Sequence, residues 1–146
     1  MGGFVVGIIV LAATVLSIWG AMRLLPGVTG WRVLARAYPS RPPGDILDRG
    51  GPVSIGTMRL GGYNNCIMWV ADEDFLHIRM MKIFSAGHAP MSIPFAAMTF
   101  TVDRQSRYIP VKLECGRTLT LPRRLVRREL ELRAAMAASE AGAGEG

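Results

Sequence analysis

Residues 4–22 read FVVGIIVLAATVLSIWGAM, a run of apolar and small side chains without a charge or a proline. Because an α-helix rises about 1.5 Å per residue, a helix of this length matches the hydrocarbon core of a bilayer, which is roughly 30 Å thick. A helix also satisfies its own backbone hydrogen bonds, as lipid requires. The sequence therefore predicts a transmembrane helix over residues 4–25, ended by Pro26.

A cleaved secretory signal peptide is the main alternative for this stretch. The residues before it, MGGF, lack the basic region that opens such signals, and the apolar run is longer than a usual signal core. The sequence Ala21-Met22-Arg23 is also a poor cleavage site. We therefore expect the stretch to remain in the protein as an anchor.

Charge is distributed unevenly around the apolar stretch. The formal net charge is +6, and every charged side chain lies beyond Met22. The arginines that follow first are Arg23, Arg32, Arg36 and Arg41. Because basic flanks stay on the cytoplasmic side, the sequence predicts a single-pass membrane protein with its N-terminus outside and its C-terminal domain cytoplasmic. Cys66 and Cys115 are then expected to be reduced thiols.

Small residues recur inside the apolar stretch. Gly3 and Gly7 form a GxxxG pair, and Ala13 and Ser17 continue with small residues at four-residue spacing. Such stripes let transmembrane helices approach closely, although small residues are also common in helices that pack against nothing. The four positions are candidate helix-packing contacts. Trp19, near the end of the stretch, fits an aromatic anchor at the membrane interface.

Residues 26–52 connect the apolar stretch to the rest of the chain. Residues 29–38 have the pattern of a short amphipathic helix, with Arg32 and Arg36 on its polar face. Its apolar face holds Trp31, Leu34, Ala35 and Tyr38. This composition suits a helix in the membrane interface, and it equally suits a helix packed on a soluble domain. Residues 39–44, PSRPPG, predict a short stiff linker.

From Val53 onward the pattern changes from helical to alternating. Apolar residues recur at every second position in short runs that are separated by Gly, Pro or acidic turns, which is typical of antiparallel strands. After Thr120 and Pro122 a helical pattern returns, with one apolar face that we expect to dock on the sheet. That face holds Leu121, Leu125, Leu132 and Met136.

The predicted fold is of the α+β class. An N-terminal transmembrane helix is followed by a small antiparallel β barrel or bent sheet over residues 53–138, which the C-terminal helix caps. Residues 139–146 are small and polar enough to form a disordered tail.

Four short fragments carry a family resemblance over about residues 30–121. They are Gly30-Trp31, Tyr63-Asn64-Asn65-Cys66, Gly87-His88-Ala89-Pro90 and Ile93-Pro94-Phe95. With strands and a capping helix beside a membrane anchor, the chain resembles the pleckstrin-homology-like (PH-like) superfamily, in particular its GRAM and bacterial PH-type members. It is more closely similar to a family of uncharacterised single-span bacterial membrane proteins. The resemblance implies a PH-like β domain and, as an analogy of fold, binding of lipid or protein.

The residues that could carry chemistry are few. Cys66, His77, His88 and Cys115 have no CxxC or HxxxH spacing, so we expect two core thiols, a surface histidine and a loop histidine instead of a zinc site. The run 72–74 fits a turn, and no phosphate-binding loop or nucleophile elbow is present. No catalytic residue, metal or cofactor is predicted. A metal- or thiol-dependent enzyme is the least favoured alternative.

The strongest surface signal is a cluster of four arginines, Arg123, Arg124, Arg127 and Arg128. Near an anionic membrane each contributes about 1 kcal/mol of attraction, and with Glu129 and Glu131 the cluster also fits a solvated helix face. Nucleic acid is not expected, because no aromatic platform lies between the arginines. The candidate contacts with a partner or membrane surface are Arg32, Arg36, Arg123, Arg124, Arg127, Arg128 and His88.

These features predict a non-catalytic, membrane-anchored binding or adaptor protein. Its cytoplasmic domain would meet a protein partner or anionic lipid headgroups. The alternative is a small accessory subunit of a larger membrane complex, packed through Gly3, Gly7, Ala13 and Ser17 of its transmembrane helix.

Overall fold

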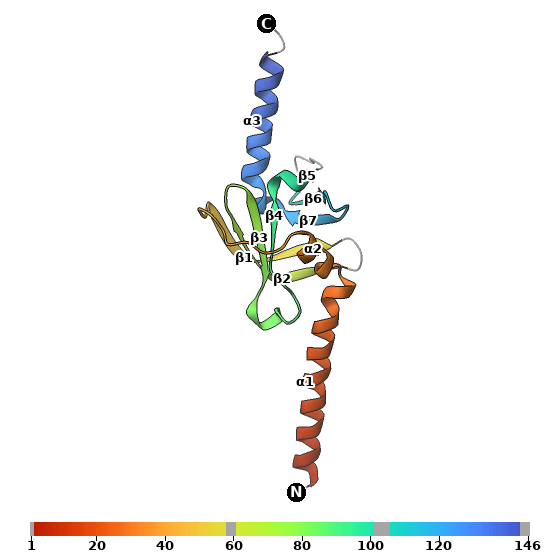
Figure 1. Ribbon diagram of the computed structural model, residues 1–146. Coiled ribbons are helices and arrows are strands. Elements are labelled where there is room, and N and C mark those ends of the chain that lie inside the picture. The colour runs from red at the N-terminus through yellow and green to blue at the C-terminus, as the bar shows by residue number, and fades with distance from the viewer. Residues whose placement is uncertain (1, 58–60, 101–105, 144–146) are drawn as a thin grey trace.

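The computed structural model describes residues 2–57, 61–100 and 106–143 of the 146-residue chain. A β domain lies in the middle, and two long helices leave it at opposite ends (Figure 1). They are α1, Gly2–Val28, and α3, Arg127–Ala143. The expected order of an apolar N-terminal helix, an antiparallel sheet and a C-terminal helix is confirmed.

Within the described residues, seven strands form one antiparallel sheet. They are β1 Asp48–Thr57, β2 Gly61–Ala71, β3 Phe75–Met80, β4 Met91–Pro94, β5 Met98–Phe100, β6 Tyr108–Leu113 and β7 Thr118–Pro122. Their order is β4-β3-β2-β1-β7-β6-β5, so two meanders meet where β1 pairs with β7. The two outermost strands, β4 and β5, are joined by the 3₁₀ turn η2, Phe95–Ala97. This connection bends the sheet into a nearly closed barrel.

The core comes from the alternation that the sequence shows. In β3 the side chains of Leu76 and Ile78 point inward and are at most 2% exposed. In the second meander, Ile109 pairs with Leu121 across β6 and β7. Burying each such side chain stabilises the fold by about 1.5–3 kcal/mol.

The β domain begins earlier than expected. We placed its start at Val53, but β1 begins at Asp48, where the strand pairs with Ala71 of β2. Residues 48–52 show no apolar alternation, because Gly50 has no side chain and the indole of Trp69 lies against its backbone. A Cβ at Gly50 would stand 3.1 Å from Trp69 Nε1.

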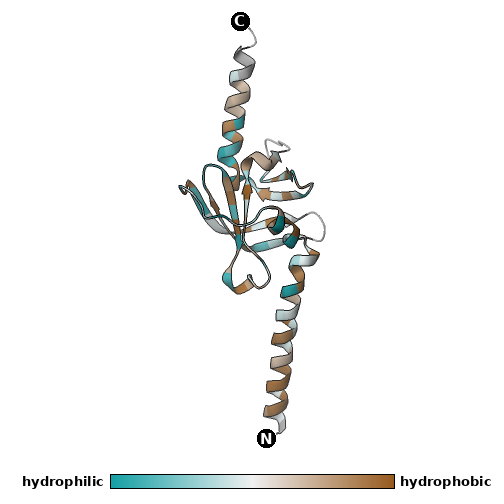
Figure 2. Cartoon of the chain, in the orientation of Figure 1, coloured by the Kyte–Doolittle hydropathy of each residue, from teal (hydrophilic) through white to brown (hydrophobic). Residues whose placement is uncertain are grey.

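Helix α1 has the length and composition to cross a membrane, features that a signal sequence near the N-terminus shares. Figure 2 shows apolar residues along most of its length. The helix continues past the expected end at residue 25 and includes Pro26. At its end, both the backbone N–H and the hydroxyl of Thr29 donate to the carbonyl of Leu25, at 2.9 Å each.

The short helix α2, Trp31–Ala37, packs on the β domain. Trp31 is 2% and Leu34 3% exposed, so the apolar face lies against the protein core. Of the two interpretations of this helix, packing on the soluble domain is therefore correct, and burial of that face in the membrane interface is wrong. The linker then crosses β4, where Pro39 forms a bridge with Met91.

The C-terminal helix begins later than predicted. Leu121 belongs to β7, and a 3₁₀ turn η3, Arg123–Leu125, precedes α3. Leu125 is buried, but Leu132 and Met136 are 47% and 64% exposed, so the expected stripe does not dock on the sheet. Only the base of the helix packs on the domain. The expected tail from residue 139 continues as helix to Ala143, and residues 144–146 lie outside the described residues.

Candidate functional site

The arginine cluster lies where β7 meets α3. Pro122 ends the strand, and the chain turns through η3. Leu125 and Val126 are 3% and 1% exposed, and they anchor this turn in the core. Because these two side chains point inward, Arg124 and Arg127 on either side of them project outward. The sequence analysis placed all four arginines on one helix, whereas Arg123 and Arg124 lie in η3 and Arg127 and Arg128 at the start of α3.

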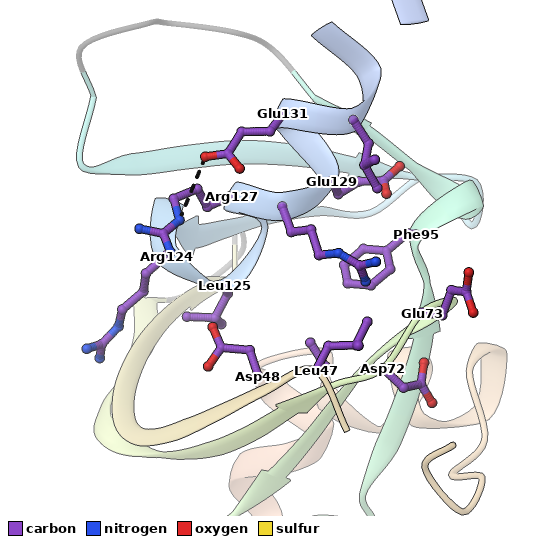
Figure 3. A pocket seen from close by; sticks show the side chains of 13 residues that line it. Leu47, Asp48, Asp72, Glu73, Phe95, Arg124, Leu125, Arg127, Glu129 and Glu131 are labelled. Atoms are coloured by element: carbon purple, nitrogen blue, oxygen red, sulfur yellow. Dashed lines mark ion pairs between the residues drawn. The ribbon is translucent and has the colours of Figure 1, made fainter. Parts of the chain in front are cut away.

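A hollow of about 430 Å³ opens beside this turn (Figure 3). Its walls come from the start of β1, the β2–β3 turn, η2, η3 and the base of α3. The lining residues are Leu47, Asp48, Ala71, Asp72, Glu73, Phe95, Arg124, Leu125, Arg127, Arg128, Glu129, Glu131 and Leu132. We call this hollow the arginine groove. In Figure 3, Arg124 lies across the groove from Asp72 and Glu73.

Several charges of the arginine groove are already paired. Glu129 Oε1 accepts a hydrogen bond from Arg133 Nε at 2.6 Å, and Arg133 also donates to the carbonyls of Met98 and Phe95. These bonds fix the base of α3 to the end of the sheet. The Arg127–Glu131 pair is 3.8 Å apart and exposed, so it contributes little.

Two arginines of the groove remain available. Among the described residues, neither Arg124 nor Arg128 has a carboxylate within 4.0 Å. Both therefore can contact a ligand without first breaking an ion pair. Leu47 and Leu132, which are 46% and 47% exposed, add apolar surface to the same groove.

A second hollow of about 410 Å³ lies on a neighbouring face. It is lined by Val53, Ser54, Asn65, Ser106, Arg107, Tyr108, Pro122, Arg123 and Arg124. The predicted cluster is thus spread over several hollows: Arg127 and Arg128 line the arginine groove, Arg124 lines both hollows, and Arg123 lines the second. Arg123 and Arg127 also line a third hollow of about 900 Å³ beside α3.

Asp72 organises the β2–β3 turn. Its Oδ1 accepts the backbone N–H groups of Asp74 and Phe75 at 3.0 and 2.7 Å. Its Oδ2 accepts the N–H of Gly44 at 2.9 Å and lies 2.9 Å from His77 Nε2. Burial by itself raises the pKa of this carboxyl, but the hydrogen bonds from His77 and the three N–H groups outweigh burial and lower the pKa to about 2.

His77 is not the surface histidine that we expected. Its Nδ1 lies 2.8 Å from Ser92 Oγ, which accepts the backbone N–H of Arg41 at 2.8 Å. Serine hydrolases use the same three residue types, Ser, His and Asp, in their catalytic triad. Here, however, Ser92 is 3% exposed, so a substrate cannot approach its hydroxyl. The line from Asp72 through His77 to Ser92 instead ties the linker at Arg41 and Gly44 to the sheet.

His88 is also buried, at 6% exposure, although it belongs to a loop. Its Nε2 lies 3.0 Å from the hydroxyl of Tyr63, which in turn hydrogen-bonds to the hydroxyl of Thr29 at the end of α1. Trp31 packs edge-on against both rings, and its Nε1 donates to Ala89 O at 2.8 Å. We call Thr29, Trp31, Tyr63 and His88 the joint, because they connect α1 to the β domain. His88 is therefore not available as the partner contact that we predicted.

The joint should be sensitive to acid. Burial lowers the pKa of His88 below 6.5, and the nearby Arg32 lowers it further. The unfolded chain then binds a proton at a higher pH than the folded one, so stability falls as the pH falls below about 6.5. We expect His88→Gln to remove this component, measured as the difference between urea midpoints at about pH 7.5 and 5.5. An unchanged difference would contradict the burial of His88.

Cys66, His77, His88 and Cys115, for which no zinc site was expected, lie in separate parts of the described chain. The described residues contain no group of three or more His, Cys, Asp or Glu side chains placed to hold a metal ion. His77 and His88 belong to the two separate networks above. Cys66 is partly buried and Cys115 is exposed, and both are free thiols, so the expectation of two core thiols is wrong for Cys115. That residue lies beyond the end of β6, at Leu113.

Gly3 and Gly7 of α1 have no neighbour from outside the helix in the described part of the chain. A Cβ at Gly3 or Gly7 would meet no atom within 4 Å. The hydroxyl of Ser17 donates to Ala13 O at 2.8 Å, so it is satisfied inside the helix. Arg32 and Arg36 lie on the exposed side of α2, next to the end of α1, and Arg32 donates to Arg23 O at 2.8 Å.

Comparison with protein-family models, with curated proteins and with solved structures finds no match to this chain. The fold itself is compatible with the resemblance drawn from the sequence: a nearly closed antiparallel sheet with a C-terminal helix fits a PH-like domain.

Proposed function

We propose that this protein is a non-catalytic, membrane-anchored adaptor. Helix α1 crosses a bacterial inner membrane with its N-terminus outside, and the β domain presents the arginine groove to a protein partner in the cytoplasm. The observation that carries this proposal is that α1 and α3 leave the β domain at opposite ends (Figure 1), and the base of α3 lines the arginine groove.

The first support is the continuous apolar surface of α1. Its large side chains are exposed along the helix, from Phe4 at 78% to Leu24 at 68%. Soluble proteins rarely expose a continuous apolar surface of this extent, because its contact with water is unfavourable. A bilayer would cover it. Arg23 stacks on Trp19, 3.7 Å from the ring centroid, as expected where such a helix leaves the hydrocarbon.

The second support is the joint. Its hydrogen bonds and ring contacts fix the end of α1 to β2 and to the loop before β4. The orientation of the β domain therefore follows from that of the helix. The groove then faces the cytoplasm, and Arg32 and Arg36 face the headgroups. This arrangement favours a protein partner over lipid for Arg124, Arg127 and Arg128.

The third support is the chemistry of the groove. Apolar side chains line part of the groove together with three arginines and five carboxylates, namely Arg124, Arg127, Arg128, Asp48, Asp72, Glu73, Glu129 and Glu131. A volume of about 430 Å³ accommodates a few side chains of a peptide segment. The exposed side chains of Leu47 and Leu132 would contact apolar side chains of such a segment, and Arg124 and Arg128 its carboxylates.

We expect the triple variant Arg124→Glu, Arg127→Glu, Arg128→Glu to lose its partner while α1 still inserts. Each exposed charge pair contributes roughly 0.5–1 kcal/mol, so reversing three charges should weaken binding tenfold or more. The measurement is affinity purification of the full chain from mild detergent, with quantification of the co-purifying proteins.

Gly7→Leu serves as the matched control, because it changes only the exposed surface of α1. If the chain is instead an accessory subunit packed through α1, this variant loses the co-purifying protein and the triple variant keeps it. The exposed stripe of Gly3, Gly7, Ala13 and Ser17 is the observation in favour of that second function. Retention of every partner by the triple variant would overturn the role of the groove.

A further inference from the structure

We propose that the tip of the loop between β3 and β4, Lys82–Phe84, inserts into the interface of the bilayer that α1 crosses. The protein would then hold the membrane at two points, a span and a reversible surface contact. This inference rests on the membrane insertion of α1, and it is independent of the role of the arginine groove.

The first observation is the composition of the tip. Lys82–Phe84 forms the 3₁₀ turn η1, and none of its residues is buried. Ile83 is 73% exposed and Phe84 is 42% exposed, and they are consecutive residues of this turn. Exposure of these two apolar side chains to water is unfavourable, and their transfer into lipid would be favourable. The neighbouring ammonium of Lys82 would be attracted to anionic headgroups.

The second observation is the direction of the loop. In Figure 1 the loop leaves the β domain on the same side as α1 and reaches the level of the last turns of that helix. The base of the loop touches α1, since a Cβ at Gly87 would lie 3.5 Å from Arg23 Cα and from Pro26. Arg23 is the first charged residue after the apolar run, so it marks where α1 leaves the hydrocarbon. A loop that reaches this level meets the headgroups.

The third observation is that the loop is held at both ends. At its start, the N–H of Met81 donates to Cys66 O at 2.8 Å. Toward its end, His88 belongs to the joint, and Trp31 Nε1 donates to the carbonyl of Ala89. The tip is therefore presented by a supported loop and needs no large ordering when it meets lipid. Arg32 and Arg36, on the exposed face of α2, add positive charge at this end of the domain.

The occupant of this apolar tip is a lipid surface, and two features favour it over a protein. The tip lies on the same side of the β domain as α1, and its apolar side chains are followed toward the domain by basic residues, which is the order of groups across a membrane interface. It also consists of only two large side chains, too small an area for a stable protein contact.

The test uses the full chain reconstituted in vesicles of phosphatidylcholine and phosphatidylglycerol. In a Cys66→Ala, Cys115→Ser background, Phe84→Cys carries an environment-sensitive fluorophore. Ala12→Cys, in the middle of α1, and Glu131→Cys, on α3, are the two reference positions. We expect the label at position 84 to show a blue-shifted emission and quenching by lipids with a spin label near the headgroup. The label at position 131 should behave as in water.

The labels at positions 84 and 12 test insertion of the tip and insertion of α1 separately. If the label at position 84 reports water while that at position 12 reports hydrocarbon, the tip does not insert and the anchor stands. If the label at position 12 also reports water, α1 does not span the bilayer, and both proposals fail.

A second measurement keeps the native cysteines. In the same vesicles, Ile83→Ser with Phe84→Ser should increase the rate of tryptic cleavage after Lys82 several-fold, because the tip is released from lipid. Ile46→Ser with Leu47→Ser is the matched control, since these side chains are 49% and 46% exposed and Leu47 lines the arginine groove at the other end. Equal cleavage after Lys82 in both variants would contradict insertion.

Discussion

Replacing Trp31 with alanine should lower the free energy of unfolding by about 3–5 kcal/mol, the usual cost of removing a buried tryptophan. The side chain is 2% exposed and packs against the rings of both Tyr63 and His88, with centroid distances of 5.1 and 5.4 Å. Its removal leaves a cavity and frees the carbonyl of Ala89. Chemical unfolding of the full chain in mild detergent, followed by near-ultraviolet circular dichroism, measures the loss.

Val33→Ala is the control on the same helix, because Val33 is 44% exposed. Such a surface change should shift stability by no more than about 0.5 kcal/mol. Trp31→Phe separates the two contributions, since it keeps a ring in the cavity and removes the hydrogen bond to Ala89. If Trp31→Ala unfolds like Val33→Ala, the joint does not hold α2 against the sheet.

The second large effect is expected at Asp72. Asp72→Ala removes the acceptor of the N–H groups of Gly44, Asp74 and Phe75 and the partner of His77. Donors left unpaired in a site that is 7% exposed should cost about 2–3 kcal/mol. Glu73→Ala, next in the turn and without these bonds, is the control.

The same carboxylate predicts a loss of stability in acid. Because its pKa is lowered from 3.8 to about 2 in the folded protein, the unfolded chain binds the proton first as the pH falls. The stabilisation is fully present above the ordinary pKa of 3.8 and disappears as the pH falls toward 2. Urea unfolding of the wild type should therefore become easier across this range. Asp72→Asn should lack this component.

The elements that local pattern determines could be predicted from the sequence. The apolar run of α1, the alternation of Leu76 and Ile78 in β3 and the apolar face of Trp31 and Leu34 each follow from spacing alone. What covers a face does not follow from spacing. For that reason the face of α2 had two interpretations, and only the packed structure decides between them.

The networks could not be predicted because they depend on pairing between distant strands. Ser92 lies opposite His77 through the register of β3 and β4, and Tyr63 meets His88 across the joint. One local signal was available at Asp72. An aspartate before Glu73-Asp74-Phe75 is typical of a turn in which the side chain accepts the N–H groups that follow, and it fits a structural role. At Leu121, strand pairing with Ile109 prevailed over the helical spacing.

The way the outer strands end has a consequence for how any partner can bind. The linker covers β4, where the N–H of Ser92 donates to the carbonyl of Tyr38. At the other outer strand, β5, the carbonyl of Met98 accepts a hydrogen bond from Arg133. Each of these contacts takes up one of the backbone groups through which a foreign strand would extend the sheet. They make strand addition at these positions unfavourable, so a partner that meets these edges has to displace the linker or Arg133 first.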